Sequence, residues 1–390
     1  MFFSVSTLLW LLLPLAAGSG WGAGRLEQRR QSARKDLPSA YFKGLNYLLN
    51  EQADKAIEIF IKVLEVNSET VETHLALGSL FRRRGEVERA IRVHQNIIAR
   101  PALDKAQRAR ALLELGQDYL KAGLFDRAEN LFLELAEIRA HTDQALRLLM
   151  NIYQQEREWE KAITVCRRLS RVINANLNDV IAQYHCELAE AAYGRQEYDV
   201  AREQARRALQ NDRGCVRASL VMGRIEASLG AHREAIKAWR RIEVQDPHYL
   251  GEIAPQLAES YRAVDDEAGL FQFLQEALNR HADVATMLAM ADVIEQRQGL
   301  DAAEAFVVSW LRRKPSVRGL HRLVGLHAAQ GSGLSPNDLA ILKGIMEEIV
   351  EHRRRYVCGH CGFSGRTLYW QCPSCHRWNT VKPAGDEHVA

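Results

Sequence analysis

The chain has 390 residues with nearly balanced charge, 52 Lys and Arg residues against 49 Asp and Glu, which gives a net charge of +3. This balance is not the signature of a nucleic-acid-binding chain. Only nine prolines and 47% hydrophobic residues argue against disorder. The length allows two or three globular domains, or one long array in which each repeat contacts only its neighbours.

The N-terminal segment, residues 1–24, carries no charged side chain and contains an apolar run about as long as the roughly 20 residues that a membrane helix requires. Five basic residues follow within residues 25–36. A cleaved secretory signal, the main alternative, needs its positive charge before the apolar run, and a buried core helix is a second alternative. We predict a transmembrane anchor at 1–24, a basic juxtamembrane linker at 25–36, and the bulk of the chain on the cytoplasmic side.

Residues 37–350 repeat a pattern in which a small residue stands twelve positions before an alanine. A bulky residue often follows the alanine by four positions, as Phe132 and Trp239 do. Successive units begin 34 residues apart, except for two longer steps of 38 and 39. This spacing is the tetratricopeptide period. The pairs of small residue and alanine are Gly44/Ala56, Gly78/Ala90, Gly116/Ala128, Ala189/Ala201, Gly223/Ala235 and Ala291/Ala303.

Small residues let two helices approach closely, and the bulky residue is expected to fill the space between neighbouring helix pairs. Gly85, Gly123 and Gly230, each seven positions after its small residue, are expected to end first helices. Pro247 and Pro315 are expected to end second helices. We predict an all-α tetratricopeptide-repeat solenoid of about nine helix pairs, with a generic helical bundle as the alternative.

The repeats contain no Gly-rich phosphate loop, His-Glu-x-x-His pair or nucleophile elbow. Cys166, Cys186 and Cys215 fall on predicted helices, where a cysteine most often serves as a small buried hydrophobe. The sequence therefore provides no candidate catalytic residue.

The first helix of each tetratricopeptide unit lines the concave surface, and its non-packing positions here are mostly basic. Glu72 and Glu190 oppose this charge, and Asp292 and Glu295 reverse it near the end. Such a groove favours a partner with an acidic segment, whereas a solvated charged face is the alternative. The basic residues predicted to bind a partner are Arg82, Arg83, Arg110, Lys121, Arg147, Arg217, Arg224 and Arg262.

Composition changes abruptly after residue 350. A basic linker at 351–355 leads into two Cys-x-x-Cys pairs separated by ten residues, Cys358/Cys361 and Cys372/Cys375. Four thiolates at this spacing can surround one metal ion tetrahedrally, and Gly362 can take the left-handed conformation that such a turn needs. Disulfides are the alternative, which a cytoplasmic location disfavours. We predict a metal-binding module at residues 356–382, followed by a tail at 383–390.

Four thiolates leave no open coordination position, so we expect a structural site. All-sulfur coordination suits zinc or a single iron, and the sequence does not distinguish the two. His360 and His376 lie beside the cysteines and are expected at the surface. A small aromatic core is expected around the metal from Tyr356, Phe363, Tyr369, Trp370 and Trp378.

The order of anchor, repeats and four-cysteine module resembles the lipopolysaccharide assembly protein B family of Gram-negative bacteria. Three stretches carry the resemblance, which covers essentially the full length: LALGSLFRRRGEVERAIR at 75–92, GQDYLKAGLFDRA at 116–128 and TLYWQCPSCHRWNTVK at 367–382. The resemblance implies a rubredoxin-like module needed for function. It also implies an inner-membrane adaptor, not an enzyme, that promotes degradation of the lipid A deacetylase LpxC by the membrane AAA protease FtsH.

Two alternatives remain. A scaffold that gathers lipopolysaccharide synthesis and transport proteins without controlling proteolysis would use the same anchor and groove. An iron-bearing module with an electron-transfer role is the second alternative, and a nucleic-acid role is disfavoured by the anchor. The sequence leaves open whether the chain forms a homo-oligomer and whether the metal module contacts the repeats.

Overall fold

The computed structural model describes residues 71–101, 103–330 and 355–384, with isolated positions at 43–44, 46–47, 55, 59, 344 and 347. The predicted anchor and juxtamembrane linker lie outside the described residues, as do Ala56 of the first repeat, residues 351–354 of the basic linker and residues 385–390 of the tail. Within the described part, no helix combines the length and apolar content that crossing a membrane requires. The chain divides into two compact units, Met1–His141 and Thr142–Ala390.

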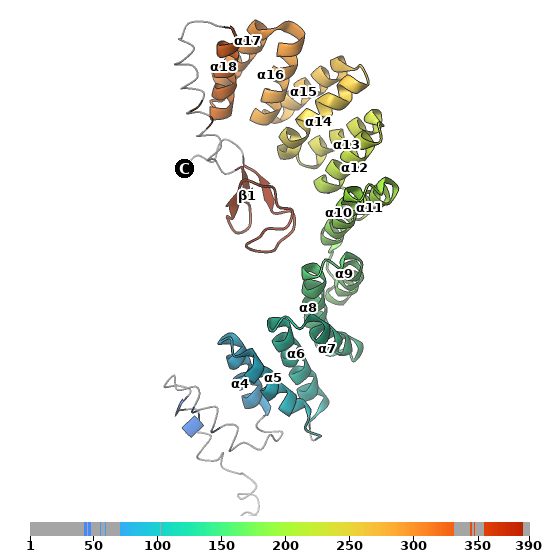
Figure 1. Cartoon of the computed structure of the whole chain (residues 1–390), viewed down its shortest axis with the longest axis vertical. Helices are drawn as coiled ribbons and strands as arrows, with labels where there is room; N and C mark the ends of the chain where they lie inside the picture. The colour runs from blue at the N-terminus through green and yellow to red at the C-terminus, as the bar shows by residue number, and fades with distance from the viewer. Residues whose placement is uncertain are drawn as a thin grey trace, which may run out of the picture. The chain divides into compact units, whose positions relative to one another are not determined.

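In the first unit, α4 packs on α5 and α6 packs on α7, and α5 also contacts α6. The pairs α4–α5 and α6–α7 are one repeat each, so the predicted helix pairs form (Figure 1). The helices are α4 (Val71–Arg83), α5 (Val87–Ile98), α6 (Lys105–Lys121) and α7 (Phe125–Glu137).

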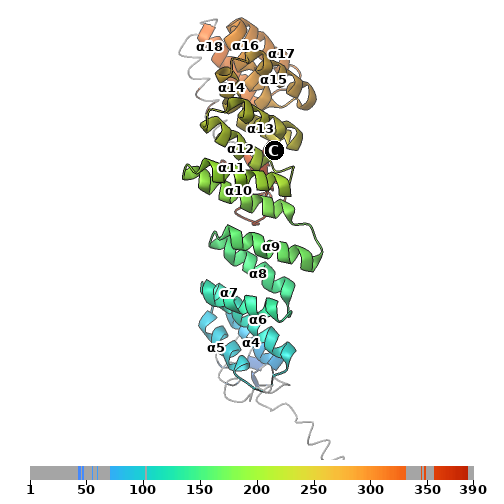
Figure 2. The ribbon, with the colours of Figure 1, turned by 90° about the vertical axis from the view of Figure 1, so that its right-hand side faces the viewer.

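The second unit continues the helix pairs and ends in three short strands (Figures 1 and 2). Its first five helices are α8 (Thr142–Gln155), α9 (Trp159–Ile173), α10 (Asn178–Gly194), α11 (Tyr198–Asn211) and α12 (Val216–Ser228). Next come α13 (His232–Gln245), the 3-10 helix η1 (Pro247–Tyr249), α14 (Leu250–Ala263) and α15 (Glu267–His281). The last are α16 (Val284–Gln298), α17 (Leu300–Leu311), α18 (Val317–Gln330), β1 (Tyr356–Cys358), β2 (Ser364–Gly365) and β3 (Val381–Pro383).

The small residues of the pattern lie where two helices of one pair touch. A Cβ added to Gly223 on α12 would stand 2.1 Å from Nε1 of Trp239 on α13. The same addition at Gly116 on α6 would stand 2.5 Å from Cε1 of Phe132 on α7. The bulky residue therefore packs against the glycine of its own pair, which corrects the expectation that it fills the space between pairs. The pattern's alanines are fully buried at Ala90, Ala128, Ala201, Ala235 and Ala303. Ala162, which follows the larger Met150 by the same twelve positions, is fully buried as well.

The predicted turn glycines are confirmed. Gly85, Gly123 and Gly230 have φ values of 83°, 76° and 74° and follow α4, α6 and α12. This left-handed conformation ends a helix at little steric cost only when the residue lacks a Cβ.

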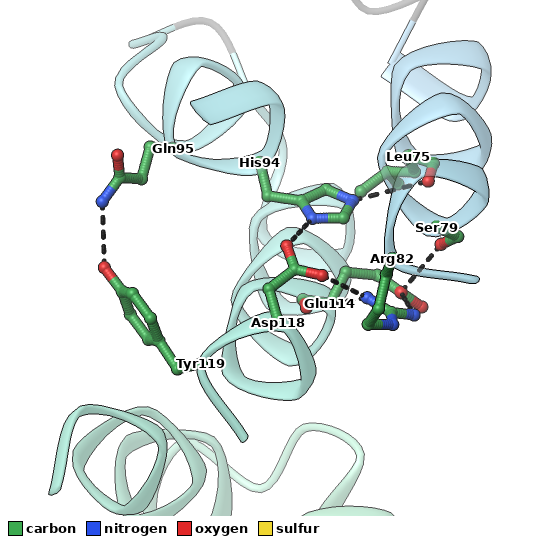
Figure 3. A network of polar contacts seen from close by, with 8 residues as sticks. All are labelled: Leu75, Ser79, Arg82, His94, Gln95, Glu114, Asp118 and Tyr119. Atoms are coloured by element: carbon green, nitrogen blue, oxygen red, sulfur yellow. Dashed lines mark hydrogen bonds and ion pairs between the residues drawn. The ribbon is translucent and has the colours of Figure 1, made fainter. Parts of the chain in front are cut away.

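An ionic network joins the first two described repeats (Figure 3). His94 on α5 takes the place of the bulky residue, and its Nε2 lies 3.4 Å from the Leu75 carbonyl oxygen. Its Nδ1 contacts the carboxylate of Asp118, which is fully buried on α6. Arg82 on α4 donates to Asp118 and to Glu114, each at 2.6 Å. Burial opposes the charged form of Glu114, yet these contacts with Arg82 lower the pKa of that carboxyl.

The strands form an antiparallel sheet in the order β2-β1-β3, with Tyr356 opposite Gly365 and Cys358 opposite Val381. Its core is small because most of its residues remain partly exposed. The buried residues are Tyr356, Cys358, Cys372 and Val381, with Phe363, Leu368 and Cys375 packed against them. A core of this size needs a metal or another surface to stabilise it.

Candidate metal centre and its seat on the repeats

Two turns of the same shape present the four cysteines. The Gly362 amide donates to the Cys358 carbonyl at 3.0 Å, and the His376 amide donates to the Cys372 carbonyl at 2.9 Å. The donor residue in each turn has a positive φ, 76° for Gly362 and 56° for His376. The left-handed conformation predicted for Gly362 is confirmed, and histidine adopts it at the equivalent position of the second turn.

The sulfur positions fit one tetrahedral metal ion. Cys358 and Cys375 Sγ are 3.8 Å apart, Cys361 and Cys372 Sγ are 3.6 Å apart, and all four lie within 4.8 Å of one another. A tetrahedron with metal–sulfur bonds of about 2.3 Å has edges of about 3.8 Å. The cluster therefore matches a closed four-thiolate site for zinc or iron. His360 and His376 are exposed and do not belong to the cluster.

The electrostatics of the cluster favour a bound cation. Burial opposes ionisation of Cys358, but hydrogen bonds from Thr380 and the backbone amides of Cys361 and His360 lower the pKa of its thiol to about 6. At Cys375 a backbone hydrogen bond from Arg377 favours the thiolate, yet burial and the neighbouring cysteines raise the pKa to about 11. Adjacent thiolates oppose each other's ionisation, and a metal cation would remove that opposition.

Trp378, three residues after Cys375, packs against the repeats. Its ring meets those of Trp159 at the start of α9 and Tyr184 on α10 edge-on, with centroids 6.2 and 5.8 Å away. Its indole N–H donates to Gln154 Oε1 on α8 at 3.3 Å. Gln371 donates to the same oxygen at 2.9 Å. One end of the metal module, residues 356–383, thus packs against α8, α9 and α10. We call the surface of the repeats that contacts the module its seat.

Trp370, two residues before Cys372, makes the second aromatic contact. Its ring stacks on Tyr249 of η1 with centroids 5.6 Å apart and planes 15° from parallel. The Arg217 guanidinium on α12 lies 5.7 Å from the centre of the Trp370 ring. Tyr249 also donates its hydroxyl to the Val381 carbonyl at 3.0 Å.

Polar contacts complete this seat. The Tyr356 hydroxyl donates to Glu252 on α14 at 2.8 Å, and burial together with this hydrogen bond raises the pKa of the phenol to about 12. Lys382 pairs with Asp246 at 2.7 Å. Burial opposes ionisation of Asp246, but Lys382 lowers the pKa of its carboxyl. The metal module therefore contacts the repeats from α8 to α14. The sequence had left open whether it contacts them.

The expected aromatic core around the metal is wrong in part. Trp370 and Trp378 face the repeats instead, because an isolated bridge between Gln371 and Trp378 brings the two segments flanking Cys372 and Cys375 side by side. Phe363 and Tyr369 do pack on each other, with ring centroids 6.0 Å apart.

Three of the eight basic residues predicted for the partner groove are engaged within the chain. Arg217 is 3% exposed and pairs with Glu187 and Glu190 on α10 at 2.8 and 2.7 Å. Burial opposes its charged form, but Glu190 raises the pKa of the guanidinium. Arg82 belongs to the network with Asp118, and Arg110 pairs with Glu72 at 2.6 Å.

The other predicted groove residues are exposed and form no side-chain hydrogen bond or ion pair within the described part of the chain. They are Arg83 and Lys121 in the first unit and Arg147, Arg224 and Arg262 in the second. Near the end, Asp292 and Glu295 both pair with Arg322 on α18. Arg322 belongs to the next repeat and offsets part of the acidic charge that reverses the sign near the end of the predicted groove.

Family models match both parts of the chain. A model described as a rubredoxin metal binding domain matches residues 356–383, and tetratricopeptide-repeat models match residues 73–109, 145–180 and 186–249. The predicted cysteines and repeats therefore fall within known families.

Two relatives resemble the chain over nearly its whole length. Lipopolysaccharide assembly protein B of Escherichia coli strain K12 is 38% identical over 379 residues, covering 96% of this chain and 97% of that protein. The protein of the same name from Haemophilus influenzae is 33% identical over 397 residues, covering 97% and 98%. Among solved structures, the MamA protein is 22% identical, covers 47% of this chain and 95% of its own, and has a TM-score of 0.31.

Proposed function

The chain belongs to the lipopolysaccharide assembly protein B family, and we propose that it is an inner-membrane adaptor in lipopolysaccharide assembly. In this role it presents the lipid A deacetylase LpxC to the membrane protease FtsH and so promotes degradation of LpxC. The cytoplasmic side of the membrane is the place of this encounter.

One observation carries the proposal: the metal module is seated on the repeats through Trp370 and Trp378. These two residues flank Cys372 and Cys375, so the metal-held turn fixes the indoles that contact α10 and η1. Four cysteine ligands leave no open position on a metal. The metal would therefore maintain a protein-binding surface, as an adaptor requires, and supply no reacting group.

The exposed basic residues support a partner with an acidic segment. In the second unit these are Arg147, Arg224 and Arg262, whose charges no described side chain offsets. Arg217 has a different role, because it pairs with Glu190 on α10 and contacts the Trp370 ring. An anchor at residues 1–24 would confine the adaptor and the protease to one surface, and the raised effective concentration would strengthen weak contacts.

The test is the half-life of LpxC after protein synthesis is blocked. We expect a longer half-life with Trp378→Ala, with Cys372→Ser/Cys375→Ser and after deletion of residues 1–24. Tyr369→Ala is the matched control, because Tyr369 lies in the same module and is 41% exposed. Among the described residues its one aromatic ring contact is with Phe363. That variant should leave the half-life unchanged.

A normal LpxC half-life in all variants, each present at wild-type abundance, would contradict the proteolysis role. If purified complexes of lipopolysaccharide synthesis and transport proteins nevertheless changed composition, the scaffold without control of proteolysis would be the correct function.

A further inference from the structure

A cleft of about 480 Å³ lies between α11 and α13, with α12 contributing to its wall. Figure 1 shows α11 and α13 on the side of these repeats away from β1, and Figure 2 shows their order along the unit. The cleft is therefore separate from the seat of the metal module. Its volume falls in the range of roughly 300–1,000 Å³ typical of small-ligand sites.

Cations dominate the lining of the cleft. The lining includes four cationic side chains, Arg206, Arg213, Lys237 and Arg241, and two carboxylates, Glu226 and Glu234. Arg206 pairs with Glu203, outside the lining, at 3.2 Å. Arg202, outside the lining, binds both oxygens of Glu226 at 2.7 and 3.0 Å and so offsets its charge. Arg213, Lys237 and Arg241 are exposed and have no side-chain partner among the residues that the structure describes. The cleft thus holds an excess of positive charge.

The loop that carries Arg213 is held in place. Gln245 at the end of α13 donates to the Arg213 carbonyl at 2.7 Å, and the Gly214 amide donates to Asp212 at 2.8 Å. These bonds fix the turn between α11 and α12 beside α13, so binding would order fewer groups. Leu209, Met222 and Ala238 provide apolar surface in the same cleft.

Adjacent arginines recur at one position of the second helices. The pairs Arg167-Arg168, Arg206-Arg207 and Arg240-Arg241 stand five and six residues after the buried alanines of α9, α11 and α13. All six side chains are exposed, but several are engaged within the chain. Arg206 and Arg207 both pair with Glu203, and the Arg240 guanidinium lies 5.2 Å from the centre of the Phe273 ring. Arg241 lines the cleft and has no such partner among the described residues, so its charge is available to an anionic ligand.

We propose that the cleft between α11 and α13 binds a ligand with at least two phosphate groups, either a free small molecule or the headgroup of a lipid. Arginine binds phosphate oxygens in pairs, and lysine adds a point charge. A cleft of about 480 Å³ suits such a group better than a folded partner segment. The proposal stands independently of the role in proteolysis.

The test measures binding of inorganic tripolyphosphate to the full-length chain by calorimetry at low salt. The triple variant Arg213→Gln/Lys237→Gln/Arg241→Gln should bind at least about tenfold more weakly, because each charge-assisted contact contributes substantially. The matched control Arg171→Gln/Arg233→Gln/Arg312→Gln removes the same charge from exposed positions outside the cleft and should change affinity less than about twofold.

Vesicles of phosphatidylcholine with and without phosphatidylinositol bisphosphate distinguish a lipid headgroup from a free small molecule as the ligand. Cleft-dependent binding to the phosphorylated vesicles supports a lipid headgroup, and binding to tripolyphosphate alone supports a free ligand. Equal weakening in both triple variants, or no binding by the wild type, would overturn the proposal. Cleft-dependent binding of poly-glutamate without binding of tripolyphosphate would replace it with an acidic peptide site.

Discussion

The indole ring of Trp370 lies parallel to the phenol ring of Tyr249, with centroids 5.6 Å apart. The two residues are far apart in sequence, and Trp370 stands only two positions before Cys372. This stacked pair is therefore one route by which a change at the metal-held turn reaches the repeats, beside the contacts of Trp378 and Gln371. Arg217 extends this contact to α10, because it touches the Trp370 ring and pairs with Glu190.

Trp370→Ala should lower the free energy of unfolding of the second unit by about 2–3 kcal/mol, since the side chain loses apolar burial, stacking and the contact with Arg217. Denaturant unfolding followed by tryptophan fluorescence and by circular dichroism measures the change. Tyr369→Ala, from the same turn but 41% exposed, should cost under about 1 kcal/mol. Equal losses in the two variants would show that stacking on Tyr249 contributes nothing specific.

Metal removal should release the metal module and leave the helices folded. A four-thiolate site contributes on the order of 10 kcal/mol to a small module, whereas the helix pairs have buried apolar cores of their own. A chelator should therefore make residues 356–383 sensitive to protease while the helical circular dichroism persists. Cys361→Ser should abolish stoichiometric metal binding, and Cys166→Ala, at a buried helix position, should retain one ion per chain. Protease resistance without metal would contradict this account.

The sequence predicted the repeats and the cysteine cluster because both depend on short spacings. Gly223 and Trp239 are 16 residues apart, and Cys358 and Cys361 are three apart. The seat of the metal module depends on pairs such as Gln154 with Gln371, which no local periodicity connects. The burial of Arg217 could not be predicted for the same reason: its position in the repeat matches that of exposed residues, but its side chain is 3% exposed and lies beside the Trp370 ring.

Gly223→Ala should destabilise the second unit, because the new Cβ would stand 2.1 Å from Trp239 Nε1 and force the indole from its place. Overpacking of this kind costs about 1–3 kcal/mol. Gly194→Ala is the control, since Gly194 ends α10 and a Cβ there meets nothing within 4 Å. That substitution should raise stability by up to about 1 kcal/mol through helix propensity and reduced unfolded-state entropy. Thermal unfolding of both variants tests whether the two substitutions change stability in opposite directions.

Arg82→Gln should lower the free energy of unfolding of the first unit by about 3 kcal/mol at neutral pH, because it leaves the buried Asp118 without its arginine. Arg83→Gln, at the adjacent exposed position, should change it by less than about 0.5 kcal/mol. Denaturant midpoints of the two variants give the comparison at equal net charge.

The loss of unfolding free energy caused by Arg82→Gln should also depend on pH. Arg82 lowers the pKa of Glu114 from its usual 4.5, so the folded state binds fewer protons than the unfolded state in the acid range. The stabilisation from this pair is complete above pH 4.5 and declines as pH falls through the lowered pKa. The difference in unfolding free energy between wild type and variant should therefore shrink as the pH falls through the lowered pKa of Glu114. A difference that stays constant down to acid pH would assign the effect of Arg82 to packing and not to its charge.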